Sequence, residues 1–412
     1  KSKKMANTIR FSGNILRRSF VSVPRRSVSI YAWGNSDNGQ LGLGNVEKQG
    51  LMGSCDVLAP QLLDTIPLDM GEVIIDINCG QDHTLAVTSN GKLYGWGSPK
   101  YGKLGQLDKD SDINIPRQIG GILSDVKVVS ASCGDRHSCA IDSEGKLYTW
   151  GFGGSWFSGG GMLGHGANSH EDQPKLVESL VEEQVKVIKA TCGELHTTIL
   201  TSDGEVMSCG GGEYGRLGHG SSSDIKIFFP LEDLEEDVIV ELVSGHAFTM
   251  AITKEGKLYV WGRNDQGQLG LGGTLSLDVY SMESYPVMID EFAKPGAPEI
   301  ETIAAGHSHA ALVTKEGELW MWGNKNYLTP KPFDVLDENG NKQVIKKVAC
   351  GQGFTAAITE DGKVYTFGDG GSKCLGHGDT KRKPQPTLVD ALSSENIDFI
   401  RPGHRHVYAF TK

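Results

Sequence analysis

Cysteine and histidine side chains recur at a fixed spacing along this sequence, in the phrase Cys-Gly-x-x-His. Cys79 and His83 form one copy, Cys133 and His137 form a second, and residues 192–196 form a third. Thiolates and imidazoles are the side chains that zinc prefers in proteins. The first question is therefore whether these pairs form a site or belong to a repeated architecture.

The corresponding positions of other copies hold side chains that cannot bind a metal. The cysteine position is filled by Ser244, Ala305 or Pro402, and the histidine position by Phe248 or Phe354. A metal ligand cannot be exchanged for alanine, whereas a tightly packed small residue can. A position that accepts His or Phe needs a flat ring that packs, with a hydrogen bond as an option. We therefore interpret these residues as architecture, expect structural thiols in a reducing compartment, and predict no metal and no cofactor.

A second phrase, Gly-Lys-Leu-Tyr-x-Trp-Gly or a close variant, follows every copy of the first except the last. The glycines of the first phrase lie 45 to 61 residues apart, a period that indicates a propeller or a solenoid. Their positions are 80, 134, 193, 245, 306, 351 and 403.

The pattern of one unit, residues 72–97, predicts short strands rich in β-branched residues, with a tight turn at Ser-Asn-Gly. A glycine-rich loop follows the unit. Three to four short antiparallel strands per unit make one propeller blade. The segment 31–34 matches the Trp-Gly strand of a unit, but no Cys-Gly-x-x-His phrase precedes it. The segment 399–412 holds a Gly-x-x-His phrase, but no Trp-Gly strand follows it. We therefore predict an all-β, seven-bladed propeller at residues 30–412, with its last blade closed by both chain ends.

The first thirty residues differ in composition from the rest. They hold eight Lys or Arg and no acid, which leaves 32 basic and 51 acidic residues, a formal charge of −19, for the remaining chain. Dispersed arginines among apolar and serine residues are typical of a mitochondrial transit peptide, which we expect at 1–29, with cleavage before about Ser29. A disordered basic tail or nuclear signal is the alternative, which leaves a nuclear or cytoplasmic location open.

The charge and the hydropathy of the chain bear on two questions: whether it binds nucleic acid and whether it crosses a membrane. An acidic body is a poor match to a polyphosphate, so we expect no direct nucleic-acid binding. No run of eighteen apolar residues exists, so no membrane span is predicted.

The paired phrases resemble those of the regulator of chromosome condensation family of seven-bladed propellers, over roughly residues 30–411. In the family's founding Ran exchange factor, a wedge hairpin that inserts beside the GTPase nucleotide site follows the third Trp-Gly. Here the third Trp-Gly is followed by an insertion over 152–162. The resemblance implies that this loop contacts a protein partner. The alternative is that Trp156 folds back onto the neighbouring blade. The residues expected at this wedge-like loop are Phe152, Ser155, Trp156, Phe157, Ser158 and Met162.

The resemblance implies further residues for an exchange face. The exchange factor has an acid just before the third-repeat histidine, where this chain has Leu195, with Glu194 one residue earlier. It also has a histidine in the fifth repeat, which His309 matches. Glu194 and His309 are therefore expected on such a face. Loops near 45–58 and 273–285, and the segment after Gly323 that lacks a Leu-Gly-x-Gly phrase, are further expected contact regions.

Several functions remain open at this stage. The leading expectation is a non-catalytic propeller in the mitochondrial matrix that binds a protein partner, as an exchange factor for an organellar GTPase. The alternative is an assembly scaffold for the mitochondrial ribosome or respiratory complexes, without exchange activity. A nuclear Ran-type factor is disfavoured by Leu195, the acidic body and the leader.

Two other classes are disfavoured. A light sensor like the plant ultraviolet-B receptor would need Gly-Trp-Arg-His-Thr repeats, which are absent. A hydrolase would need a nucleophile or metal motif, and none appears, so no catalytic residue is predicted.

Overall fold

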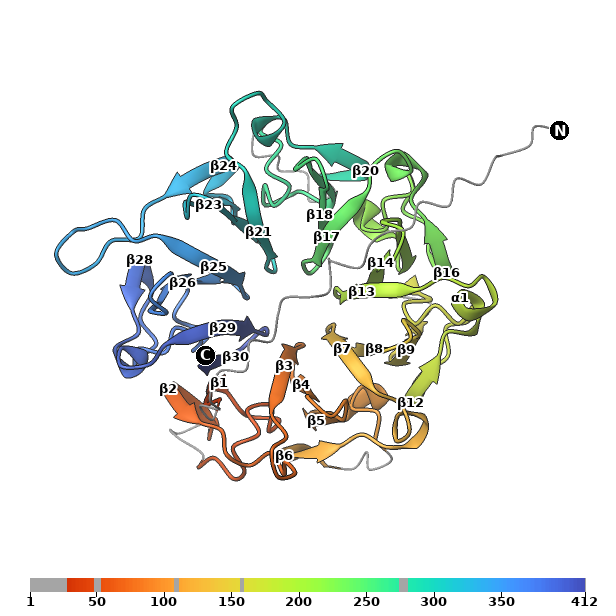
Figure 1. The fold of residues 1–412 in the computed structure, drawn as a ribbon, viewed down its shortest axis with the longest axis horizontal. Coiled ribbons are helices and arrows are strands. Elements are labelled where there is room, and N and C mark those ends of the chain that lie inside the picture. Colours follow the sequence, from red (N-terminus) through yellow and green to blue (C-terminus); the bar gives the residue numbers. More distant parts are fainter. Residues whose placement is uncertain (1–27, 48–52, 107–110, 156–158, 274–280, 412) are drawn as a thin grey trace.

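The computed structural model describes residues 28–47, 53–106, 111–155, 159–273 and 281–411. Seven four-stranded antiparallel sheets radiate from a common axis, and Figure 1 shows them as the blades of a ring. The predicted seven-bladed propeller is therefore confirmed. We number the blades in chain order and describe each from the axis outward.

Blades 1 to 3 contain the following strands. Blade 1 consists of β3 (Ile74–Cys79), β4 (His83–Thr88), β5 (Leu93–Gly97) and β6 (Ile113–Gln118). Blade 2 consists of β7 (Val128–Cys133), β8 (His137–Asp142), β9 (Leu147–Gly151) and β12 (Glu171–Leu176). Blade 3 consists of β13 (Val187–Cys192), β14 (His196–Thr201), β15 (Val206–Gly210) and β16 (Ile225–Pro230).

Blades 4 to 7 repeat the same order. Blade 4 consists of β17 (Ile239–Ser244), β18 (Phe248–Thr253), β19 (Leu258–Arg263) and β20 (Met282–Met288). Blade 5 consists of β21 (Ile300–Ala305), β22 (His309–Thr314), β23 (Leu319–Gly323) and β24 (Tyr327–Phe333). Blade 6 consists of β25 (Ile345–Cys350), β26 (Phe354–Thr359), β27 (Val364–Gly368) and β28 (Lys383–Leu388). Blade 7 consists of β29 (Ile397–Pro402), β30 (His406–Thr411), β1 (Ile30–Asn35) and β2 (Asp56–Leu62).

Both ends of the described chain share blade 7, as predicted. Strand β1 pairs antiparallel with β30, and Trp33 lies opposite Val407 in that register. The pairing gives the outer half of the blade to the N-terminal segment and the inner half to the C-terminal segment. Strand β30 is therefore not left as an unpaired edge at the point where the ring closes.

Each inner histidine joins its blade to the next one. His83 Nε2 lies 2.9 Å from Ser138 Oγ, the residue after the corresponding histidine of blade 2. Because Ser138 Oγ donates to the Lys103 carbonyl at 2.8 Å, it accepts from the imidazole N–H. Four further histidines bond a threonine hydroxyl of the next blade in the same way, and these pairs are His137–Thr197, His196–Thr249, His309–Thr355 and His406–Thr84.

At two junctions the histidine is replaced by a phenylalanine, and the residue that it faces in the next blade carries no hydroxyl. Phe248 of blade 4 is followed in blade 5 by Ala310, and Phe354 of blade 6 is followed in blade 7 by Val407. A histidine therefore faces a serine or threonine in the next blade, and a phenylalanine faces an apolar residue. The histidines are buried, with at most 2% exposed, which confirms their structural interpretation.

The repeat glycine is required by this packing. A Cβ on Gly80 would collide with the ring of His83 and with the backbone oxygen of Gly134 in blade 2. The inner turns of neighbouring blades therefore meet backbone to backbone around the axis.

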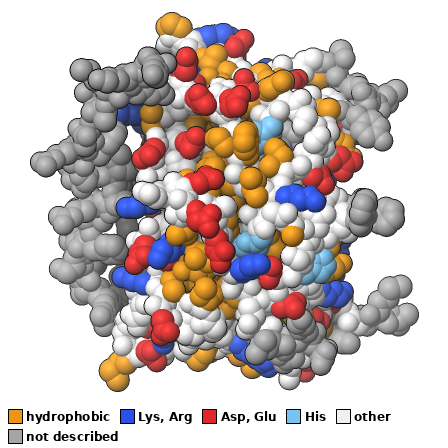
Figure 2. Space-filling model, turned by 90° about the vertical axis from the view of Figure 1, so that its right-hand side faces the viewer, with side chains coloured by type: hydrophobic (Ala, Val, Ile, Leu, Met, Phe, Trp, Pro, Cys, Tyr) orange, Lys and Arg blue, Asp and Glu red, His pale blue; other side chains and the backbone are white. Residues whose placement is uncertain are grey.

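The connections between blades lie at the opposite end of the strands from these turns. They run from the outer strand of one blade to the inner strand of the next and contain one short α-helix, α1 (Glu178–Glu182), and 3-10 helices such as η2 (Gly121–Leu123) and η4 (Glu232–Leu234). Seen from the side, hydrophobic side chains lie interspersed with acidic and basic ones on the described surface (Figure 2).

The structure also bears on the expected thiols and on the expected lack of a membrane span. All eight cysteines are free thiols, and most are buried. Among the described residues, no helix combines the length and the apolar composition needed to cross a bilayer.

Candidate partner-binding face

One face of the ring carries both the inner turns and the loops that follow the Trp-Gly strands. The two sets start side by side, because the residue after each Trp-Gly donates its N–H to the inner turn: Ser98 to the Asp82 carbonyl at 2.8 Å, and Phe152 to the Arg136 carbonyl at 2.9 Å. We call this the axial face. The insertion after the third Trp-Gly therefore lies on the same face as the mouth of the central channel.

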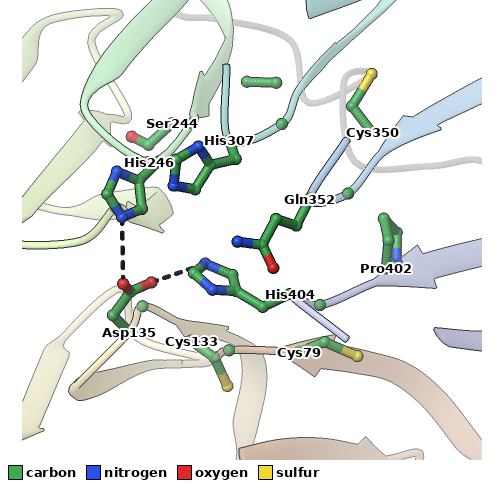
Figure 3. Close-up of a pocket in the computed structure, with 18 of the residues that line it drawn as sticks. Cys79, Cys133, Asp135, Ser244, His246, His307, Cys350, Gln352, Pro402 and His404 are labelled. Carbon is green, nitrogen blue, oxygen red and sulfur yellow. Dashed lines mark ion pairs between the residues drawn. The ribbon is translucent and has the colours of Figure 1, made fainter. Parts of the chain in front are cut away.

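In five of the seven blades, the residue directly after the repeat glycine lines the mouth of the central channel. Figure 3 shows Asp135, His246, His307 and His404 converging on the channel mouth from four different blades. The mouth holds a cavity of about 120 Å³, walled by the repeat glycines. The seven residues at this sequence position, which we call the axial ring, are Gln81, Asp135, Glu194, His246, His307, Gln352 and His404.

Asp135 is the centre of charge in the axial ring. Its Oδ1 lies 3.0 Å from His404 Nε2, and its Oδ2 lies 3.4 Å from His246 Nε2. Burial alone would raise the pKa of Asp135, but the two imidazoles outweigh it and hold that pKa well below its usual range. Burial likewise opposes charge on His404, but Asp135 raises the pKa of His404 above its ordinary value. The mouth therefore holds a buried carboxylate that favours the charged form of His404.

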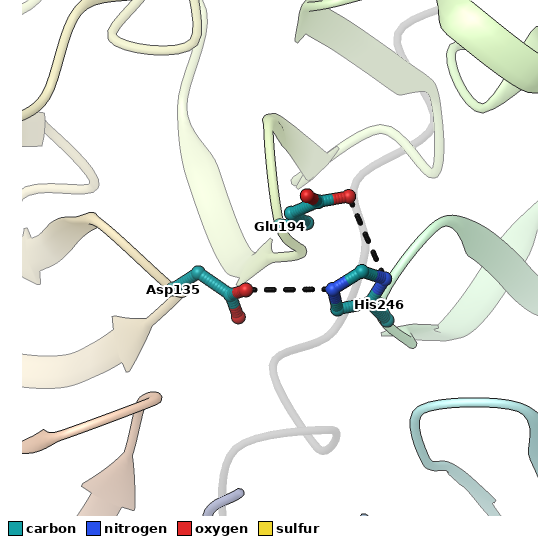
Figure 4. A group of neighbouring side chains, drawn as sticks. All are labelled: Asp135, Glu194 and His246. Carbon is teal, nitrogen blue, oxygen red and sulfur yellow. Dashed lines mark ion pairs between the residues drawn. The ribbon is translucent and has the colours of Figure 1, made fainter. Parts of the chain in front are cut away.

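Glu194 extends this network toward blade 3. Its carboxylate lies 3.5 Å from His246 Nδ1 and 3.2 Å from an Arg216 guanidinium nitrogen, and Arg216 is itself 1% exposed. Figure 4 shows His246 between the carboxylates of Asp135 and Glu194. One ligand atom from each of these three residues lies within 4.8 Å of the others, so the set has the donors and the spacing to hold a divalent cation.

His307 completes the stacked side of the ring. Its imidazole centroid lies 4.0 Å from that of His246 and 6.0 Å from that of His404. Burial, followed by the charges of these two neighbours, lowers the pKa of His307 to about 4. A neutral imidazole has one ring nitrogen that donates and one that accepts, so His307 gives the mouth both kinds of hydrogen-bonding group.

The insertion in blade 2 forms a two-stranded hairpin, β10 (Gly154–Ser155) with β11 (Gly159–Gly160). Phe152 and Met162 flank it and are buried with Leu163 and Leu195 in one apolar cluster. The Gly160 N–H donates to Asp224 Oδ2 at 2.9 Å, which fixes the hairpin against the loop of blade 3. The hairpin is thus anchored at its base to two blades.

The structure changes the role of two expected contact residues. Phe152 is 5% exposed and Met162 is fully buried, so neither side chain reaches a partner, and both instead support the hairpin. Ser155 lies on β10 and is half-buried. Trp156, Phe157 and Ser158 lie outside the described residues, so their partner contact stays a prediction.

His309 was expected on the exchange face, and the structure places it elsewhere. It is 2% exposed and its Nε2 lies 3.0 Å from Thr355 Oγ1, so it is one of the interblade histidines. Burial lowers its pKa to about 4. His307, two residues earlier, is the fifth-blade histidine at the channel mouth. Glu194, by contrast, does lie on the axial face.

The axial ring was missed by the sequence analysis, which considered the glycine and the last residue of each phrase. A signal was present, because no residue directly after a repeat glycine is apolar and five of the seven are Asp, Glu or His. Polar residues that change type from copy to copy, at a fixed position in a repeat, are more typical of a binding surface than of a core.

Models of two protein families match this sequence. A model described as the RCC1-like domain matches residues 156–412, and a model of the regulator of chromosome condensation (RCC1) repeat matches residues 29–87 and 90–141. Both descriptions refer to the RCC1 repeat architecture.

Three relatives match over most of this chain. The human E3 ubiquitin-protein ligase HERC2 is 31% identical over 397 residues, 93% of this chain but 8% of that protein. The ultraviolet-B receptor UVR8 of Arabidopsis thaliana is 36% identical over 295 residues, 69% of this chain and 63% of the receptor. The mitochondrial RCC1 domain-containing protein RUG3 of Arabidopsis thaliana is 29% identical over 348 residues, 78% of this chain and 75% of that protein.

A solved structure shares the fold. Prp20p from Saccharomyces cerevisiae, described with its binding properties to Gsp1p and histones, superposes with a TM-score of 0.79 at 23% identity and covers 94% of this chain and 92% of its own.

Proposed function

Because this chain belongs to the regulator of chromosome condensation family, we propose that it is a non-catalytic propeller whose axial face binds a protein partner. The observation that carries this proposal is the hairpin anchored by Phe152 and Met162, whose base packs on Leu195, the residue after Glu194 of the axial ring. A hairpin fixed at its base to two blades can present its tip without a large loss of conformational entropy on binding.

We further propose that the partner is a mitochondrial GTPase and that the bound propeller speeds release of its nucleotide. Exchange needs no covalent step, because a factor that binds the nucleotide-free GTPase more tightly than the GDP-bound form shifts the equilibrium toward release. The likeness to Prp20p supports the fold alone. The mitochondrial assignment rests on the basic leader over 1–29 and on the similarity to RUG3, which is named as mitochondrial.

One feature of the axial face favours a partner other than Ran. Leu195 lies where the exchange factor has an acid, and it is buried in the apolar base of the hairpin. An acid at this position would leave an unpaired charge among apolar side chains. The hairpin base of this chain is therefore built differently.

The tryptophans support binding rather than light sensing, despite the similarity to UVR8. Trp33, Trp96, Trp150, Trp261 and Trp322 each occupy the Trp-Gly position and are at most 1% exposed. Buried at separate blade junctions, they are not available to form a cluster at a dimer face.

The exchange proposal is tested with mitochondrial GTPases loaded with fluorescent GDP. We expect one of them to release GDP faster on addition of the propeller. The double variant Trp156→Ala, Phe157→Ala should lose at least tenfold of that effect, as expected for aromatic anchors. The matched control Val181→Ala, on α1 at the opposite face, should behave as the wild type.

A different result would favour the scaffold alternative. No acceleration with any of these GTPases, together with nucleotide-independent co-purification with a ribosomal or respiratory assembly, would refute exchange. The compartment is tested separately by fusing residues 1–36 to a fluorescent reporter, and a diffuse or nuclear signal would contradict the mitochondrial assignment.

A further inference from the structure

The space between neighbouring blades is filled by a leucine in six of the seven junctions. The leucine comes from the Leu-Gly phrase in the loop after each Trp-Gly strand and packs against the corresponding strand of the next blade. These leucines are each at most 1% exposed, and they are Leu41, Leu104, Leu163, Leu217, Leu269 and Leu375.

The loop is held in place from both sides. At the junction between blades 4 and 5, Trp322 donates its indole N–H to the carbonyl of Gln268, the residue before Leu269, at 2.9 Å. At the junction between blades 7 and 1, Thr84 donates its hydroxyl to the carbonyl of Gln40, which also precedes a leucine, at 3.0 Å. An indole or hydroxyl of the next blade thus binds the backbone beside the leucine.

Blade 5 supplies no such loop. Its third strand ends at Gly323 and its fourth begins at Tyr327, so residues 324–326 form the whole connection. The Trp-Gly position of the next blade holds Phe367, which has no N–H to donate. Cys209 takes this position in blade 3, where the preceding loop and Leu163 are present, so the indole is not required for the loop. Among the described blades, the connection without a Leu-Gly phrase is the one in blade 5, and it precedes Phe367.

A cleft of about 600 Å³ remains where the loop would lie, a size within the range of peptide and ligand pockets. Apolar side chains form part of its lining: Phe333 and Phe367 stack with centroids 5.3 Å apart, and Met321 and Trp322 line the same cleft. Thr355 lines it as well, at the position where Thr84 binds a loop carbonyl in blade 1. The rest of the lining is polar and includes Asn324, Asp369 and Arg382.

We propose that this cleft binds a leucine-bearing, turn-forming segment of a protein partner, in place of the loop that the other blades supply internally; in the loop that carries Leu269, the Gly267 N–H donates to the Asn264 carbonyl at 3.0 Å. The argument for this occupant is the chain itself, because six junctions show which side chain and backbone path the same walls accept. The cleft opens on the axial face, since residues 324–326 follow a Trp-Gly strand. The inference does not depend on nucleotide exchange, and it concerns a site separate from the hairpin.

The test uses a fluorescein-labelled peptide with the sequence of residues 263–272, which carries Leu269, titrated with the full chain and followed by fluorescence anisotropy. We expect saturable binding. The same peptide with Leu269→Ala should bind at least tenfold more weakly, because the leucine side chain supplies most of the apolar contact. The protein variant Phe367→Trp should bind the leucine peptide several-fold more tightly, since it restores the indole donor.

A filled variant gives the matched negative control. Residues 211–224 follow Gly210 and return to Ile225, in the same register in which 324–326 follow Gly323 and return to Tyr327. Replacing 324–326 with a copy of 211–224 should fill the cleft from within and abolish peptide binding, with a circular dichroism spectrum like the wild type.

Three outcomes would overturn the proposal: equal binding of the leucine and alanine peptides, wild-type binding by the filled variant, or no binding at roughly millimolar protein. If the filled variant does not fold, the comparison of the two peptides and the Phe367→Trp variant still decides.

Discussion

The pairing of a histidine with a hydroxyl across each junction can be tested by giving one junction the composition of another. His83 and Ser138 join blades 1 and 2 through a 2.9 Å hydrogen bond. Phe248 and Ala310 occupy the same positions between blades 4 and 5. We predict that His83→Phe and Ser138→Ala are each destabilising alone and nearly neutral together.

The magnitudes follow from which polar group is left without its partner. His83→Phe removes the donor to Ser138 Oγ, and Ser138→Ala leaves the His83 N–H buried without an acceptor. Each single change should cost about 1–3 kcal/mol of the free energy of unfolding. In the double variant both groups are gone, and the Lys103 carbonyl keeps its bond from the Trp150 indole at 2.9 Å. The double variant should therefore lie within about 1 kcal/mol of the wild type.

The assay is equilibrium urea unfolding of the four proteins of this double-mutant cycle, followed by tryptophan fluorescence. The account predicts a favourable coupling energy of about 1–2 kcal/mol or more between the two changes. Additive losses would refute it, because they would mean that the histidine and the serine stabilise the ring independently. The conservative variant Ser138→Thr, which introduces the side chain found at four other junctions, should retain wild-type stability.

Three further predictions concern the ring and the hairpin. Gly80→Ala should lower the urea midpoint markedly or prevent folding, because its Cβ would collide with the backbone of Gly134; wild-type stability would contradict the backbone-to-backbone packing. Phe152→Ala should cost about 3–5 kcal/mol as a cavity variant and should weaken partner binding by loosening the hairpin, and an unchanged midpoint would show that the hairpin base is not packed as described. Burial, and then the charge of Lys103, keeps the pKa of His83 well below its usual value of about 6.5, so below that pH the unfolded state takes up a proton that the folded state refuses. Stability should fall with falling pH by up to about 1.4 kcal/mol per pH unit from this residue, and the double variant His83→Phe, Ser138→Ala should show a shallower fall; identical slopes would contradict this assignment.

The blade count and the closure could be predicted because they depend on short-range pattern. A turn glycine, a β-branched strand and a Trp-Gly strand repeat with a period that fits only a few architectures, and the two incomplete units at the chain ends complement one another. The structural role of the histidines followed from Phe248 and Phe354 at equivalent positions, since a packing position accepts either ring.

The candidate site could be predicted only in part, because it depends on which side chains point toward the axis. Glu194 and His309 both came from matching positions to a family, but the strand that begins at His309 directs that side chain between blades, whereas the turn before it directs His307 to the channel mouth. Phe152 and Met162 read as exposed loop residues, because nothing in their local sequence shows that Leu163 and Leu195 lie beside them. The absent Leu-Gly phrase after Gly323 was visible, but its meaning needed the six filled junctions.

The most direct test of the central claim, that the partner binds the axial face, is site-specific photocrosslinking in mitochondria. A benzophenone amino acid is placed at Ser155 on the hairpin in one variant and at Val181 on α1, at the opposite face, in another. The account predicts that one protein crosslinks from position 155 and not from 181, and that the crosslink is lost when Trp156 and Phe157 are replaced by alanine. A protein that crosslinks from 181 and not from 155 would contradict it.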